Sequence, residues 1–294
     1  MAIRTDLAME HRAFQDESHL PGGVRLRRET KQGVSVTVLE IKSRSAARQL
    51  GRDRGSYITV ELGQMLRGDR ERFDRTVQVL GGCLRELLAL PPSLPVLVAG
   101  LGNRDVTPDA LGPMTAENIL VTRHMLRAMP VEFSRFRPVA ALIPGVPGTT
   151  GVDSGDMIRA MASRLEAAAV IAVDALAARD TGRLCSTVQL TDTGIIPGSG
   201  LGSRMEAINR ASLGIPVFSL GIPTVTDAAT LAEDLLTASG VHPPELPTSG
   251  DGRMVVTCAD IDRRVRDASR LLAFSINYAL QPTLRVKDLW DLTF

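Results

Sequence analysis

Two kinds of hydrophobic pattern divide the chain. The segments 34–41 (VSVTVLEI) and 56–62 (SYITVEL) alternate β-branched and polar positions, which predicts strands with one buried face. Continuous short apolar runs follow at 94–99, 138–143, 168–173 and 215–220, each just before a Gly, Pro or Asp cluster. Runs of this length are typical of strands that are buried on both faces of a sheet.

Apolar residues at helical spacing separate several of these runs. They predict helices at about 72–90, 114–129, 155–167, 227–239 and 259–280. The alternation indicates an α/β fold, a mostly parallel twisted sheet with helices on both faces, in one main domain. Residues 30–65 would add extra N-terminal strands to it. The Pro/Gly-rich segment at about 240–253 predicts a mobile surface loop.

Composition narrows the class of protein. The 294 residues carry 34 Lys and Arg against 33 Asp and Glu, so there is no basic excess of the kind that drives nucleic-acid binding. No apolar run approaches the length of a membrane span, and the charged N-terminus is unlike a signal peptide. The three cysteines are far apart, which excludes a disulfide framework and a thiolate zinc site. We therefore expect a cytoplasmic protein with no nucleic-acid or membrane partner.

Common cofactor and nucleophile motifs are absent. There is no P-loop, no H-E-x-x-H and no G-x-S-x-G. Gly100-Leu101-Gly102 begins like the dinucleotide-binding motif G-x-G-x-x-G, but Asp105 occupies the position of the third glycine. GSGLGS at 198–203 also lacks the third glycine of that motif, because Ser203 occupies its position. These absences argue against a P-loop nucleotide site, a dinucleotide site, a zinc-peptidase site and a serine-hydrolase site.

Two aspartates stand out beside the predicted strands. Asp109 lies in GLGNRDVTPDALGP (100–113), directly after the run 94–99, and Asp174 ends the apolar run in IAVDALAAR (171–179). Strand ends of α/β sheets collect functional groups, and two carboxylates that share such a site would separate their pKa values, so that one holds a proton while the other activates water. That is the chemistry of peptide hydrolysis without a metal, although the pair could also bind a divalent ion.

Structural roles remain open for both aspartates. Asp109 could simply cap the helix that follows it. Asp174 could form an ion pair with Arg179 or Arg123. His124, alone in a helical stretch, is either a packed or surface residue or an orienting group near Asp109.

Three Gly-, Ser- and Thr-rich segments are expected at the same edge of the sheet. They are 144–156, 191–204 and 221–228. Such loops could supply backbone amides to an oxyanion or clamp a peptide, or they could be plain connections. The length of the first two favours a functional role.

Seven ordered motifs carry a family resemblance. They are RTDLA (4–8), GLGN…VTPDALGP (100–113), LVTRH (120–124), PGVPGTTG (144–151), DALAAR (174–179), TDTGIIPGSG (191–200) and GIPTVTDA (221–228). From about residue 4 to residue 236 the chain resembles the germination proteases, or spore proteases, of spore-forming Firmicutes.

The resemblance implies an activity and a site. It implies a homotetrameric endopeptidase of the forespore or spore core that degrades small acid-soluble spore proteins at germination. The mechanism would be of an atypical aspartic type without a cofactor, and the family's two catalytic aspartates fall on Asp109 and Asp174. The fold would be of the hydrogenase-maturation-protease-like or phosphorylase-like kind.

The resemblance also implies a zymogen that cleaves itself at T-D-L-A, here between Asp6 and Leu7. Residues 1–6 would then be a propeptide and 7–294 the peptidase domain. Because the residue before the cut is acidic, we expect a cation to bind its carboxylate, with Arg123, Arg179 and Arg204 as candidates.

Two alternative functions remain. A hydrogenase-maturation-type peptidase shares the broad fold and a G-x-G-N turn followed by an aspartate, but it is shorter and does not account for T-D-L-A or D-A-L-A-A-R. A catalytically inactive scaffold of the same fold is the other, and the presence of both Asp109 and Asp174 argues against it.

Overall fold

The computed structural model describes residues 5–11, 14, 20–63, 69–199, 205–241 and 254–293. The strands are β1 (Val24–Lys31), β2 (Val34–Ile41), β3 (Gly55–Glu61), β4 (Val96–Gly100), β5 (Val139–Leu142), β6 (Ala169–Ala177), β7 (Thr187–Thr191), β8 (Val217–Asp227) and β9 (Val255–Val256). The α-helices are α1 (Arg44–Leu50), α2 (Arg70–Leu88), α3 (Leu111–Glu117), α4 (Arg123–Ala128), α5 (Pro147–Thr150), α6 (Ser154–Leu165), α7 (Arg210–Leu213), α8 (Ala228–Ala238), α9 (Ile261–Leu280) and α10 (Val286–Thr293). Short 3₁₀ turns are η1 (Ala8–Glu10), η4 (Thr107–Asp109) and η5 (Thr181–Arg183).

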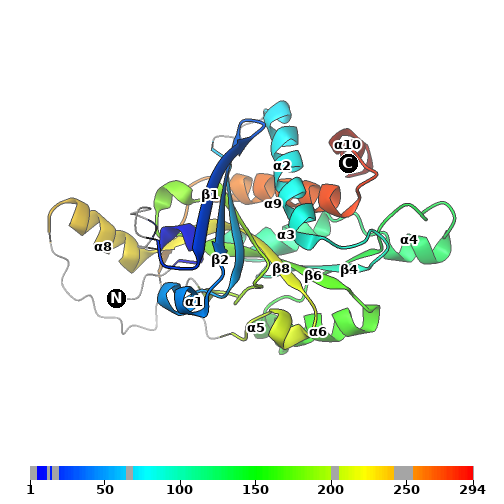
Figure 1. Cartoon of the computed structure of the whole chain (residues 1–294), viewed down its shortest axis with the longest axis horizontal. Coiled ribbons are helices and arrows are strands. Elements are labelled where there is room, and N and C mark those ends of the chain that lie inside the picture. Colours follow the sequence, from blue (N-terminus) through cyan, green and yellow to red (C-terminus); the bar gives the residue numbers. More distant parts are fainter. Residues whose placement is uncertain are drawn as a thin grey trace.

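The strands form one mixed sheet in the order β1-β2-β3-β7-β8-β6-β4-β5, and β9 pairs with the end of β8. Figure 1 labels β1, β2, β8, β6 and β4 of this sheet. The α/β class is confirmed, but the expectation of a mostly parallel sheet holds for only part of the sheet. Within the described residues, β8, β6, β4 and β5 are mutually parallel, whereas β1, β2, β3, β7 and β8 pair antiparallel. The sequence patterns did not single out β1 and β7, because β1 is mostly charged and β7 is only five residues long.

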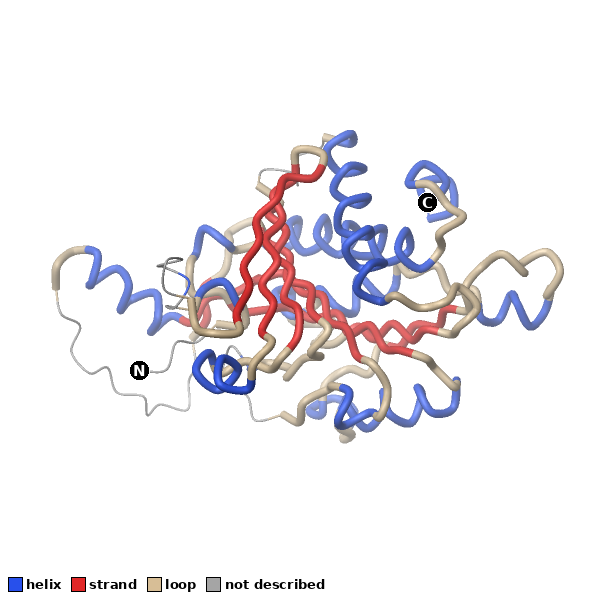
Figure 2. The backbone as a smooth tube through the Cα atoms, in the orientation of Figure 1, coloured by secondary structure: helices blue, strands red, loops and turns tan. Residues whose placement is uncertain are grey.

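Alternate residues of the central strand β4 pack into two different hydrophobic cores, one on each face of the sheet. Val96 and Val98 of β4 pack in the larger core, which includes residues of α2, α3, α9 and α10, while Leu97 and Ala99 pack in a smaller core with residues of α6. Figure 2 shows α-helices on both sides of the strands, as the sequence predicted. Asp174 and Gln189 lie on the face of the smaller core, because Val173 and Leu190 beside them enter the larger one.

Two predicted elements differ from the structure. The expected helix over 114–129 is divided into α3 and α4, because Asn277 of α9 accepts a hydrogen bond from Leu120 N (2.9 Å) and donates one to Asn118 O (3.1 Å). These tertiary bonds replace the helical ladder at the break. The segment 221–228, expected as a loop, belongs almost entirely to β8.

Other expectations fall partly outside the described residues. Most of the loop predicted at about 240–253 lies outside the described residues, as does Arg204.

The strands predicted within 30–65 join the main sheet through the pairing of β3 with β7. Within the described part of the chain, we find no helix with the length and apolar character that a bilayer span requires.

Candidate active site

Asp109 and Asp174 lie just beyond the last paired residues of two neighbouring parallel strands. Gly100 of β4 pairs with Val173 of β6, so Asp174 is the first residue of β6 past the end of β4. Asp109 closes η4, the turn that follows β4 and contacts β6. Asp174 does not end its strand as predicted, because β6 continues to Ala177.

Two glycines allow the loop that carries Asp109 to pack tightly. Gly102 has a φ of +107°, and a Cβ there would lie 2.1 Å from Asp109 O. A Cβ on Gly112 would lie 2.4 Å from Val173 O. Only glycine permits these approaches, which hold the Asp109 turn against the start of the Asp174 segment.

The Asp109 carboxylate binds the backbone of its own loop. Asn103 N donates to Oδ2 at 2.6 Å. The capping alternative is wrong, because the N-cap of α3 is Ala110 and no side chain caps it. Burial raises the pKa of Asp109, and the bond from Asn103 partly opposes this rise.

Asp174 is only 4% exposed. Its Oδ1 accepts a hydrogen bond from Ala175 N at 2.9 Å. Burial, and then the negative charges of Asp109 and Asp6, raise the pKa of Asp174 well above 3.8. The ion-pair alternative is wrong for Arg179, which binds Asp234 instead, and no ion pair among the described residues involves Asp174.

The N-terminal segment lies against the free end of β6. Asp6 N donates to Ala177 O at 2.9 Å, and Ala177 N donates to the Asp6 carboxylate at 2.8 Å. The pairing register of β6 with β8 shifts between Leu176 and Ala177, so these bonds form at a β-bulge. Bulges are frequent beside active sites, where they re-aim backbone groups.

The residues after Asp6 are buried. Leu7 is 1% exposed and packs with Leu176, Ala178 and Leu184, while Ala8 is fully buried. Burial of a leucine side chain stabilises its position by about 1.5–3 kcal/mol. The T-D-L-A sequence is thus held along its length within the protein.

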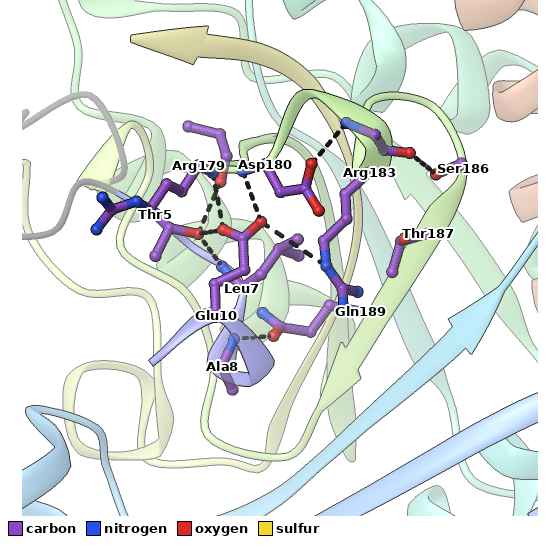
Figure 3. A network of polar contacts seen from close by, with 12 residues as sticks. Thr5, Leu7, Ala8, Glu10, Arg179, Asp180, Arg183, Ser186, Thr187 and Gln189 are labelled. Carbon is purple, nitrogen blue, oxygen red and sulfur yellow. Dashed lines mark hydrogen bonds and ion pairs between the residues drawn. The ribbon is translucent and has the colours of Figure 1, made fainter. Parts of the chain in front are cut away.

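Polar contacts fix the same segment on its other side (Figure 3). Gln189 of β7 donates from Nε2 to Asp6 O at 2.9 Å and accepts at Oε1 from Ala8 N at 2.6 Å. Sequence reasoning missed Gln189, because it lies in a strand that the patterns did not predict and belongs to no motif.

Glu10 is a second contact that the sequence did not indicate. It accepts hydrogen bonds from Arg179 N (2.8 Å), Asp180 N (3.0 Å) and the Thr5 hydroxyl, and Arg183 Nε lies 3.8 Å away (Figure 3). Glu10 thereby ties the segment after Leu7 to the loop that follows β6.

The Asp6 carboxylate receives its described hydrogen bonds from neutral groups. They come from Ala177 N and, at 2.5 Å, from Ser199 Oγ. Arg179 is paired with Asp234, and Arg123 lies half-buried on α4. His124, also on α4, is exposed.

A cavity of about 380 Å³ adjoins the segment. Its lining includes Asp6, Leu176, Gln189, Gly221 and residues of the 191–199 loop, and it includes none of 144–156. Of the three segments expected at the site, the structure brings 191–199 and the first part of 221–228 beside Asp6. The arrangement combines two electrostatically coupled aspartates, Asp109 and Asp174, with an extended peptide held by strand β7 and the end of β6.

Comparison with known proteins identifies the family. The germination protease family model matches residues 2–239. The chain belongs to the germination protease family. It is 36% identical to the germination protease of Caldanaerobacter subterraneus subsp. tengcongensis over 98% of this chain and 97% of that one. It is 34% identical to the germination protease of Clostridium perfringens over 98% of both chains, and 37% identical to that of Bacillus cereus over 80% of this chain and 66% of the other.

Membership of the germination protease family makes the chain a protease that acts in spore germination, with proteins as substrates. The two polar residues that sequence reasoning missed, Gln189 and Glu10, both contact the segment that contains the T-D-L-A motif.

Proposed function

We propose that this germination protease is an endopeptidase that starts the degradation of small acid-soluble spore proteins, and that it is made as a zymogen which cleaves its own Asp6–Leu7 bond. One observation carries the proposal: Asp6 is bound at the end of the strand that holds Asp174, close enough for its charge to raise the pKa of that aspartate. A bound substrate would have to occupy the same place.

Asp109 and Asp174 perform the hydrolysis as an aspartic-type pair. Asp174 takes the part of the acid, because burial and two neighbouring negative charges raise its pKa well above 3.8 and favour its neutral form. Asp109 is stabilised as a carboxylate by Asn103 N and serves as the base that activates water. The pair needs no cofactor in this scheme, since a shared proton supplies both the acid and the base.

The bound N-terminal segment keeps the precursor latent. It fills the position of a substrate. Leu7 lies in an apolar pocket, and the Asp6 carboxylate accepts hydrogen bonds from Ala177 N and Ser199 Oγ. Cleavage releases residues 1–6 and with them the bonds that Thr5 and Asp6 make. The vacated surface then accepts an acidic residue of a substrate, for which Arg123, Arg179 and Arg204 remain candidate partners.

The proposed cellular location and assembly are those that the resemblance to the germination proteases implies. The enzyme would act in the cytoplasm of the forespore and spore core, as a homotetramer. Light scattering coupled to size exclusion tests the assembly, and a mass of one or two chains would contradict it.

Digestion of a purified small acid-soluble spore protein tests the activity. We expect cuts on the carboxyl side of an acidic residue that precedes a large apolar residue, as in the T-D-L-A motif. The Asp109→Asn protein, prepared in parallel, should make none of them. An intact substrate after incubation with processed wild-type protein would favour the inactive scaffold instead.

A further inference from the structure

We propose that Gln189 is a catalytic residue of the self-cleavage reaction, in which its amide holds the peptide on both sides of the scissile bond and stabilises the oxyanion. The inference rests on the proposed cut between Asp6 and Leu7. No sequence motif includes Gln189, so its position in the fold carries the argument.

Gln189 and Asp174 belong to one row across three strands. Asp174 of β6 and Gln189 of β7 both pair with Gly221 of β8. Paired residues project on the same face, and neighbouring strands are about 4.8 Å apart, so the two backbones are about 10 Å apart with β8 between them. That distance accommodates one extended peptide chain between an acid and an amide.

The middle position of the row carries no side chain of its own. Gly221 is required there because a Cβ would lie 2.5 Å from Leu176 Cγ and 2.8 Å from Asp174 O. Asp6 contacts Ala177 of β6 and Gln189 of β7 at once, so the segment spans the two strands on either side of β8. Asp6, Gln189 and Gly221 line the same cavity.

The two hydrogen bonds fix the orientation of the Gln189 amide. Asp6 O can only accept and Ala8 N can only donate, so Nε2 must face the carbonyl and Oε1 must face Ala8. At 7% exposed, the amide has little access to water that could replace these partners. A donor held in this way strengthens its bond as negative charge develops on the carbonyl oxygen.

The reaction step balances with these groups. Asp109 takes one proton from water as the water oxygen bonds to the Asp6 carbonyl carbon. The carbonyl π electrons move to Asp6 O, which receives the Asp174 proton while it accepts the hydrogen bond from Gln189 Nε2. The C–N bond then breaks, and its electrons and the proton on Asp109 go to the Leu7 nitrogen. Asp174 recovers its proton from the hydroxyl that becomes part of the Asp6 carboxyl group.

Two substitutions remove the Nε2 donor in different ways. Gln189→Glu keeps the acceptor for Ala8 N and adds a charge, whereas Gln189→Met keeps the length and stays neutral. The control is Thr187→Val, also buried on β7, whose hydroxyl binds Glu61 and does not touch the segment. Each protein is assayed by intact mass for loss of residues 1–6 and by kcat and KM on a synthetic peptide of residues 2–12, with thermal unfolding as the test of folding.

We expect both Gln189 variants to lose about 100-fold in kcat, the loss typical of one oxyanion donor, while Thr187→Val retains the wild-type value. Both variants should also raise KM, because Gln189→Met releases Asp6 O and Ala8 N, and Gln189→Glu turns a carboxylate oxygen toward Asp6 O. A wild-type kcat in a folded Gln189 variant overturns the inference and leaves the proposed function intact. A wild-type protein that cuts neither itself nor the peptide overturns both. If Gln189→Glu does not fold, Gln189→Met decides the question alone.

Discussion

The parallel and antiparallel halves of the sheet contribute different parts of the site. In the parallel half, β4 and β6 run in the same direction, so Asp109 and Asp174 meet beyond the paired ends of these strands. In the antiparallel half, Gln189 projects from the middle of β7 and binds peptide backbone. β8 pairs with both halves, and its Gly221 pairs with both Asp174 and Gln189. In the proposed mechanism, the parallel half supplies the proton chemistry, from a tightly packed turn and from strand β6, and the antiparallel half supplies the groups that bind an extended chain.

The largest effect should come from the parallel half. Asp109→Asn and Asp174→Asn should each lower kcat on the synthetic peptide by roughly 100- to 10,000-fold, because each removes the acid or the base. The double variant should be no worse than the poorer single one, since the pair acts as a unit. Asp105→Asn, an exposed carboxylate in the same loop as Asp109, is the matched control and should match wild type. Substantial activity in Asp174→Asn would remove that residue from the mechanism.

A smaller loss is expected where the segment is bound through apolar contact. Leu7→Ala should slow the release of residues 1–6 by roughly 10- to 100-fold, because the pocket of Leu176, Ala178 and Leu184 is left partly empty. Leu7→Met conserves volume and should stay close to wild type. Mass spectrometry over time measures both rates, and equal rates for Leu7→Ala and wild type would show that the pocket does not position the cut bond.

Two variants can show which group binds the carboxylate of the residue before the cut, the neutral Ser199 hydroxyl or an arginine. Ser199→Ala removes the described hydroxyl bond and should raise KM for the synthetic peptide by up to about tenfold. Arg179→Met breaks the pair with Asp234 and should change KM little if the neutral partners suffice. The reverse order, with a large effect only for Arg179→Met, would favour the arginine hypothesis drawn from the sequence.

The smallest effect concerns stability and has a defined pH dependence. The folded-state pKa of Asp174 lies above 3.8, so wild type loses stability as the pH rises from 3.8 through that raised pKa. Asn cannot ionise, so Asp174→Asn should have a higher Tm than wild type at neutral pH, and the difference should shrink as the pH falls toward 3.8. A difference in Tm that is the same at both pH values would show that ionisation of Asp174 is not its source.

These two halves also differ in what the sequence could predict. The strands of the parallel half could be predicted from uninterrupted apolar runs such as 94–99 and 168–173, each of which is followed by glycine or aspartate. Strand β7 is only five residues long, so its alternation of polar and apolar residues did not stand out, and no motif drew attention to Gln189. The bulge at Leu176 and Ala177 depends on pairing with β8, which local sequence does not encode.

Tertiary contacts account for the remaining differences. Asn277 interrupts the helix predicted over 114–129 through bonds to residues that are more than 150 positions away. From the sequence, Asp109 could be a helix cap, but in the structure its carboxylate accepts a hydrogen bond from Asn103 N instead. The contact of Asp6 with Ala177 joins positions that are 171 residues apart, and no spacing rule predicts it.

The central claim is that the Asp109 and Asp174 pair cleaves the chain's own bond between Asp6 and Leu7. Its most direct test is an intact-mass time course of the purified full-length chain beside Asp109→Asn and the control Asp105→Asn. We predict loss of residues 1–6 in wild type and Asp105→Asn and an unchanged mass in Asp109→Asn. Equal loss in all three proteins, or cleavage at another bond in wild type, would contradict the claim.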